Sequence, residues 1–261
     1  MAIRSLPLLS GLILLLLSLV PPCRAEDIPS AGQAMDIVKT DFGNFYLEPS
    51  NLLRLGVGLA GASLFATTNM DREIRDKYQE EIRSDGTDRI AKIVKVPGEG
   101  LVAVPLYIGA YGAGMFFRNP AMEEWAQRSF RATAVGIPAV FFLQNAIGAG
   151  RPPDGGSEWR PFRDNEGASG HAFIGGIPFI TAAKMSENPY AKGAFYGLSI
   201  LPGLSRINDD YHYFSQAAMG WYLAYLSCRA TLMTDKEREG KTDFAFVPAR
   251  NGFAVAFHRY F

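Results

Sequence analysis

Apolar residues along the chain gather into six segments that are separated by polar or charged stretches. Glycine, alanine and aromatic residues dominate these segments, and small residues of this kind let helices approach each other closely. The segments span residues 52–67, 101–117, 132–149, 171–183, 194–204 and 217–233. The pattern predicts an all-α fold, a bundle of about six helices within a domain at residues 51–233.

A charged stretch, MDREIRDKYQEEIRSDGTDRIAKIV, lies between the first two apolar segments. Its periodicity predicts an amphipathic helix, then a turn at Asp85-Gly86, then a second short helix. Residues 26–50, which precede the domain, are predicted to form a polar lead-in without an assigned element.

The N-terminus has the layout of a secretory signal over residues 1–25. One positive charge precedes the apolar run LPLLSGLILLLLSLV, and the small residues Cys23 and Ala25 follow it, so cleavage is expected after Ala25. An uncleaved anchor is the alternative, and a lipid attached to Cys23 is disfavoured because Pro22 precedes it. Cleavage would leave Cys228 as the one cysteine, so no intramolecular disulfide is expected.

The tail, residues 234–261, changes to an alternating pattern around Asn251-Gly252. This predicts a linker and a short C-terminal β-hairpin, with His258 at the surface. The hairpin either packs on the bundle or, because the chain ends in Tyr260-Phe261, serves as an outer-membrane address.

Composition and segment length favour an exported membrane protein. The formal net charge is zero, which argues against nucleic acid as a partner. A membrane span needs about 20 apolar residues, and the segments at 101–117 and 132–149 nearly reach that length. If the first segment, which carries Arg54, does not span, the polar stretches near residues 150–170 and 205–216 face outward. A soluble or peripherally bound exported bundle is the alternative.

Three polar stretches stand at ends of the predicted helices. They are QNAIGAGRPP at 144–153, ASGHAF at 168–173 and SRINDDYHYFSQ at 205–216. The first ends one apolar segment, the second begins the next, and the third follows the segment after that. This order places all three at the same end of the bundle, where their side chains can converge.

The residue types in these stretches suit an oxyanion. Arg151 and Arg206 are planar, permanently charged donors for phosphate oxygens. Ser169 and Gly170 begin a helix, whose free N–H groups and dipole favour an anion. His171 and His212 exchange protons or attack near neutral pH. Because no HxxxH or HxxE spacing is present, neither a metal nor another cofactor is expected.

Together these stretches resemble the type 2 phosphatidic acid phosphatase superfamily, whose signature is KxxxxxxRP, PSGH and SRxxxxxHxxxD. The resemblance covers roughly residues 50–233. The residues that match are Arg151-Pro152, Ser169-Gly170-His171, and Ser205-Arg206 followed by His212.

The resemblance implies a helical phosphatase of lipid phosphates, isoprenoid diphosphates or soluble phosphomonoesters. It makes His212 the nucleophile and His171 the group that protonates the leaving oxygen. The residues that would hold the phosphate are Arg151, Arg206, Ser169, Gly170 and Gln144.

Three positions depart from the signature. Gln144 replaces its lysine, Ala168 its proline, and Gln216 the aspartate that would orient the nucleophile. A glutamine carbonyl can accept the N–H of His212 but brings no charge, and the amide can flip. Asp209 and Asp210, just before His212, are the alternative orienting groups.

The sequence therefore predicts a metal-free phosphatase in the cell membrane, with a periplasmic active site and a lipid phosphate or isoprenoid diphosphate as substrate. A soluble exported acid phosphatase of the same superfamily is one alternative. A catalytically weak membrane protein that binds phosphate or lipid head groups is another, supported by the two glutamines. An oxidase like the vanadate-dependent haloperoxidases, which share the site, is disfavoured because the chain lacks their extra length and lysine.

Overall fold

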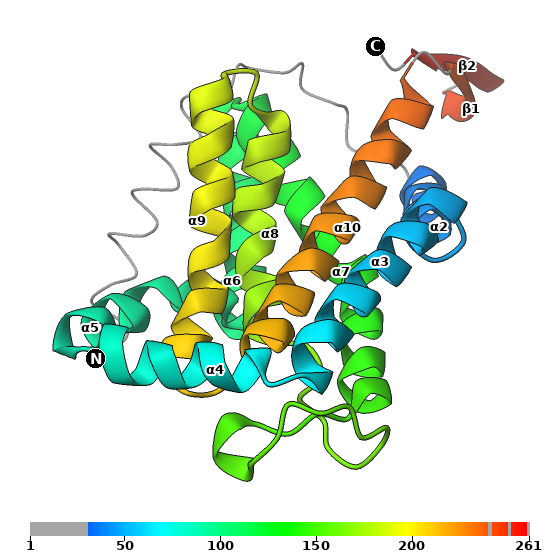
Figure 1. Cartoon of the computed structure of the whole chain (residues 1–261). Helices are drawn as coiled ribbons and strands as arrows, with labels where there is room; N and C mark the ends of the chain where they lie inside the picture. The colour runs from blue at the N-terminus through cyan, green and yellow to red at the C-terminus, as the bar shows by residue number, and fades with distance from the viewer. Residues whose placement is uncertain (1–30, 240–241, 250–251, 260–261) are drawn as a thin grey trace.

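The computed structural model describes residues 31–239, 242–249 and 252–259, and it confirms an all-α helical bundle (Figure 1). The described α-helices are α2 (Ala31–Tyr46), α3 (Pro49–Thr67), α4 (Met70–Lys77), α5 (Asp85–Val94), α6 (Gly100–Phe117), α7 (Pro120–Ile147), α8 (Gly170–Met185), α9 (Pro189–Asn208) and α10 (Phe214–Arg238). Short turns of other helix types lie at Tyr78–Ile82, Val96–Gly98 and Pro152–Asp154. The signal predicted at residues 1–25 lies outside the described residues.

The six predicted apolar segments correspond to α3 and to α6 through α10. Three of these helices extend well beyond their apolar segments, since α7 begins at Pro120, α9 spans Pro189–Asn208 and α10 continues to Arg238. Asn119 caps the N-terminus of α7 by accepting a hydrogen bond from the Met122 N–H at 3.1 Å. The added turns at the start of α7 contain several charged residues, so they do not form part of an apolar run.

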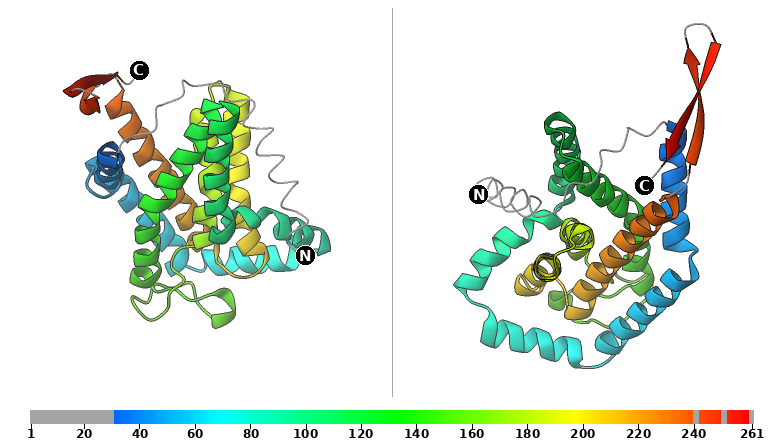
Figure 2. Two further views of the ribbon diagram at one scale, coloured as in Figure 1. Left: turned by 180° about the vertical axis from the view of Figure 1, so that it is seen from behind. Right: turned by 90° about the horizontal axis from the view of Figure 1, so that it is seen from above.

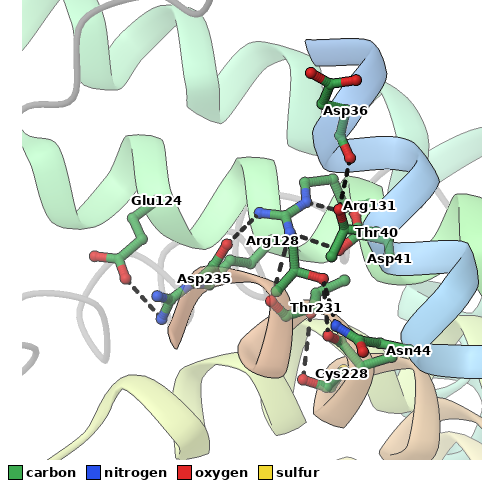
Figure 3. A network of polar contacts seen from close by, with 12 residues as sticks. Asp36, Thr40, Asp41, Asn44, Glu124, Arg128, Arg131, Cys228, Thr231 and Asp235 are labelled. Atoms are coloured by element: carbon green, nitrogen blue, oxygen red, sulfur yellow. Dashed lines mark hydrogen bonds and ion pairs between the residues drawn. The ribbon is translucent and has the colours of Figure 1, made fainter. Parts of the chain in front are cut away.

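Helix α2 lies within the stretch that was predicted as a polar lead-in. It packs on α7 and α10, and ion pairs and hydrogen bonds satisfy the polar side chains that this buries (Figure 3). Asp41 pairs with Arg131 of α7, and Asn44 donates a hydrogen bond to the Thr234 hydroxyl at 3.2 Å.

The turn predicted at Asp85-Gly86 is wrong, because both residues belong to the first turn of α5. The chain breaks at Ser84 instead, whose hydroxyl accepts from the Thr87 N–H while the Thr87 hydroxyl accepts from the Ser84 N–H. This capping box, with Asp85 near the positive end of the helix dipole, starts the helix earlier than the Asp-Gly pair indicated.

Helix α8 is at the centre of the bundle and packs against α7, α9 and α10. Its side chains are buried almost throughout, and Phe173, Ile177 and Ile180 are at most 1% exposed. A Cβ atom added to Gly175 would lie 2.5 Å from the Cβ of Pro202, so the close contact of α8 with α9 requires glycine there. Figure 2 shows α3, α4 and α5 curving around the outside of these inner helices.

Strands β1 (Thr242–Ala249) and β2 (Gly252–Arg259) follow α10 and pair antiparallel, with Thr242 opposite Arg259. The turn between the strands was predicted at Asn251-Gly252, and Asn251 lies outside the described residues.

Two helical stretches in the described part of the chain are long and apolar enough to cross a membrane. They are Gly100–Phe117, with mean hydropathy 1.5, and Pro120–Asp154, with mean hydropathy 1.4. Only 22% of the first is buried inside the protein, against 56% of the second. Large apolar side chains therefore face outward along α6, including Leu101, Ile108, Phe116 and Phe117.

Candidate active site

The end of α7, the start of α8, the end of α9 and the start of α10 meet at the lower end of the bundle in Figure 1. Hydrogen bonds join the three polar stretches there. The Ser169 N–H donates to the Gln216 backbone carbonyl at 2.9 Å, and the Gln216 side-chain Nε2 donates to the Gly150 carbonyl at 2.7 Å. The stretches predicted to lie together therefore do so.

Helix α10 passes very close to the start of α8. A Cβ atom at Gly220 would collide with the carbonyl oxygen of Ser169 and would lie 3.2 Å from the Cβ of Ala172. Glycine at this position brings the beginning of α10, and with it Gln216, against the first turn of α8.

His212 precedes α10 and is 5% exposed. Its Nδ1 lies 3.1 Å from Oε1 of Gln216, which also accepts a hydrogen bond from the Tyr213 N–H at 3.0 Å. Nε2 of the same amide donates to the Gly150 carbonyl. A flipped amide would therefore place its NH₂ group against the Tyr213 N–H and its oxygen against the Gly150 carbonyl, and both hydrogen bonds would be lost. Gln216 is therefore fixed as an acceptor, so Nδ1 of His212 carries the proton and Nε2 keeps its lone pair.

Two arginines lie against the Tyr211 ring beside this histidine. The guanidinium carbon of Arg206 lies 4.3 Å from the ring centroid and that of Arg151 lies 4.9 Å from it. Arg206 is 7% exposed, and burial lowers its pKa although Asp209 opposes the shift. The buried Nε atoms of both arginines have no hydrogen-bond partner among the described residues. Buried donors of this kind are costly unless something binds them.

The first turn of α8 contributes the second polar stretch. The Ser169 hydroxyl accepts from the Ala172 N–H at 3.3 Å and so caps the helix. Gln144 lies beside Gly170, 3.7 Å from where a Cβ would be, and its Nε2 donates to the Ala168 carbonyl at 2.9 Å. Gln144 thus helps hold the turn and retains a second N–H.

His171 is half-buried in the same turn. Burial lowers its pKa to about 4, and the positive charges of Arg206 and Lys95 act in the same direction. Burial also lowers the pKa of His212 to about 4, with Arg206 and Arg151 adding to the effect and the Gln216 hydrogen bond opposing it. Both rings are therefore uncharged at neutral pH.

Asp209 and Asp210 were predicted as alternative groups to orient His212. Neither is hydrogen-bonded to Nδ1 of His212, which Gln216 contacts instead. Asp210 accepts two hydrogen bonds from Arg75 of α4, at 2.8 and 2.5 Å. Asp209 pairs with Lys95 at 3.6 Å and with Arg206 at 3.3 Å. Both carboxylates neutralise cations around the site instead.

Two carboxylates that sequence reasoning missed complete the surroundings. Asp71 of α4 is fully buried and accepts from the Ser215 N–H at 2.9 Å and from its hydroxyl at 2.5 Å, which fixes the start of α10. Glu166 accepts from Arg151 at 2.5 Å. Neither lies within a polar stretch of the signature, so no local signal marked them.

Within the part of the chain that the structure describes, no group of three or more His, Cys, Asp or Glu side chains is arranged to hold a metal ion. Comparison with known proteins finds no matching family model, no matching curated protein and no matching solved structure.

The low pKa values lead to a direct test by histidine NMR, which is tractable because the sequence contains three histidines. A lowered pKa means that protonation is resisted, so His171 and His212 should stay neutral as pH falls and charge only near pH 4. The ¹⁵N shifts of His212 should report a proton on Nδ1 at neutral pH. His171→Asn and His212→Asn assign the signals. Titration of either ring near the ordinary value of about 6.5 would contradict the buried, cationic surroundings.

Proposed function

We propose that this chain is a metal-free phosphatase that hydrolyses a lipid phosphate or a polyprenyl diphosphate through a phosphohistidine on His212. The contact between His212 and Gln216 carries the proposal. It leaves Nε2 with a free lone pair, next to two arginines whose buried Nε atoms have no partner in the part of the chain that the structure describes. A nucleophile with a free lone pair, beside permanent cations that keep unused N–H donors, is an arrangement that suits phosphoryl transfer.

The first step is attack of the Nε2 lone pair on phosphorus. An N–P bond forms as the P–O bond to the leaving group breaks, and His171 gives its proton to the leaving oxygen. His171 is neutral in this structure, but a bound phosphate dianion raises the pKa of a neighbouring imidazole and so favours its charged form. Substrate binding would thus supply the acid that the step needs.

The second step returns the site to its starting state. Water attacks phosphorus while His171 takes a proton from it, the N–P bond breaks, and phosphate leaves His212. Arg151 and Arg206 would stabilise charge on the phosphoryl oxygens in both steps. The N-terminal turn of α8, with Ser169, Gly170 and the nearby Gln144, would add partial positive charge on the same side.

The apolar outer surface of the bundle favours a lipid substrate and a membrane location. Helix α6 has the length and hydropathy of a membrane span and exposes large apolar side chains. In a bilayer, that surface would be covered by acyl chains, and the tail of a lipid phosphate would have an apolar path toward the site. Together with the predicted signal, this favours export to the cell membrane with the site facing outward.

Phosphate release from a substrate panel tests the proposal. The purified, detergent-solubilised full chain should release phosphate from a phosphatidic acid or a polyprenyl diphosphate faster than from a soluble phosphomonoester. A preference for the soluble ester, with release of the protein from membranes by carbonate, would favour the exported acid phosphatase. No release from any member of the panel would overturn the proposal.

A binding protein with weak turnover is the second candidate, because Gln144 and Gln216 are uncharged. In the phosphohistidine the imidazole gains positive charge, which a glutamine carbonyl offsets less than a carboxylate does. Phosphate binding without release would select this candidate.

A further inference from the structure

Glu166 lies beside two of the residues that the proposed function assigns to phosphoryl transfer, Arg151 and His212. It belongs to the connection between α7 and α8, and its side chain is 17% exposed. One carboxylate oxygen accepts a hydrogen bond from Nη2 of Arg151 at 2.5 Å. The other lies 3.8 Å from Nε2 of His212, the nitrogen that keeps its lone pair.

The contact with His212 is not a hydrogen bond. Since Gln216 holds the proton on Nδ1, Nε2 and the carboxylate oxygen are both acceptors, and 3.8 Å is beyond hydrogen-bond distance. Glu166 is therefore held by its hydrogen bond to Arg151, and it makes no hydrogen bond to His212. A phosphoryl group attacked by Nε2 must lie against the same nitrogen and use the same arginine.

We infer that Glu166 is an internal competitor for phosphate and a specificity-determining residue of the site. Its carboxylate takes the place of a phosphate oxygen between Arg151 and His212, and it leaves that place when a phosphate ester binds. This inference rests on the proposed function. An ester with an apolar tail has additional binding energy to displace the carboxylate, whereas inorganic phosphate has none. Glu166 thus favours esters over the product and helps to expel the product.

The backbone around Glu166 is held, so the exchange needs only rotation of a side chain. The Glu166 N–H donates to the Ala149 carbonyl at 3.1 Å, and the Gly167 N–H donates to the Gln144 carbonyl at 3.3 Å. Farther back in the connection, the Phe162 N–H donates to the Asn145 carbonyl at 2.8 Å.

Calorimetric titration with orthovanadate and with inorganic phosphate tests the inference. We expect Glu166→Gln to bind both anions at least about tenfold more tightly than wild type, because one charge a few ångströms away shifts ionic equilibria by about one to three powers of ten. Glu166→Ala should change affinity in the same direction. Inorganic phosphate should also become a stronger inhibitor of turnover in both variants.

Glu158→Gln is the matched control. It removes one negative charge from the same connection, but the Glu158 side chain is 47% exposed and pairs with Arg160 at 3.2 Å and with Arg72 at 3.8 Å rather than with Arg151 or His212. Its anion affinity should equal that of wild type, and melting temperatures show whether each variant is folded.

Unchanged or weaker anion binding in folded Glu166 variants would overturn the inference and leave Glu166 with the role of positioning Arg151. Wild-type turnover in the substrate panel would show that the proposed function survives that result. Absence of both turnover and anion binding in every variant would overturn the proposed function together with the inference.

Discussion

Replacing His212 by alanine should reduce phosphate release by at least about 10⁴-fold, because it removes the atom that forms the covalent intermediate. The arginines and the α8 N-terminus would still bind the substrate, so the loss should appear in kcat rather than in KM. Steady-state phosphate release from the best lipid substrate measures it, with the melting temperature as the check on folding.

Two measurements make this result specific. His258→Ala removes the third histidine of the sequence, which belongs to none of the three polar stretches, and should retain wild-type turnover. Brief reaction with a ³²P-labelled substrate should leave acid-labile label on wild type, as expected of a phosphorus–nitrogen bond, and none on His212→Ala. Turnover that persists in His212→Ala would exclude His212 as the nucleophile.

The convergence of the three polar stretches could be predicted because it follows from helix order alone. Consecutive antiparallel helices return their ends to the same side of a bundle, so residues near 150, 170 and 210 meet if the helix count between them is right. The arrangement of Gln216 could not be predicted in this way. Its orientation depends on the Gly150 carbonyl, 66 residues away in the chain, and on the Tyr213 N–H.

Charged neighbours of the site were the harder part to predict. Sequence proximity favoured Asp209 and Asp210 as partners of His212, but Asp210 has a φ of 58° and pairs with Arg75, 135 residues earlier. Glu166 was missed for the same reason, since its pairing with Arg151 depends on how the α7–α8 connection folds back. Spacing in the sequence predicts elements and their order, whereas ion pairs depend on three-dimensional placement.

Helix α2 and the first turns of α7 were not predicted from the hydrophobic pattern, and the reason is the same for both. Helix α2 and the first turns of α7 carry charges that normally indicate solvent exposure, yet several of these charges are buried in pairs. Figure 3 shows the network that joins α2, α7 and α10. Arg131 is 9% exposed and contacts Asp41 at 2.8 and 2.6 Å and Asp235 at 2.7 Å. Arg128 reaches Asp235 at 2.7 Å.

Arg131→Met should therefore destabilise the fold by about 3–5 kcal/mol, the usual cost of removing one partner from a buried ion pair. Methionine fills much of the volume, but Asp41, which is only 2% exposed, would lose its cation and remain buried. The free energy of unfolding, measured in detergent by denaturant titration, gives the effect.

Arg83→Met is the matched control, since it breaks an arginine–aspartate pair at the surface. Arg83 contacts Asp88 at 3.1 Å with 37% of its side chain exposed, so the loss should be within about 1 kcal/mol. Asp235 lies near the far end of α10, roughly 30 Å along the helix from His212, so Arg131→Met should keep its turnover at temperatures where it is folded. Equal stability of the two variants would mean that the buried network contributes little to the fold. Loss of turnover in folded Arg131→Met would instead mean that the network, through α10, positions the active site.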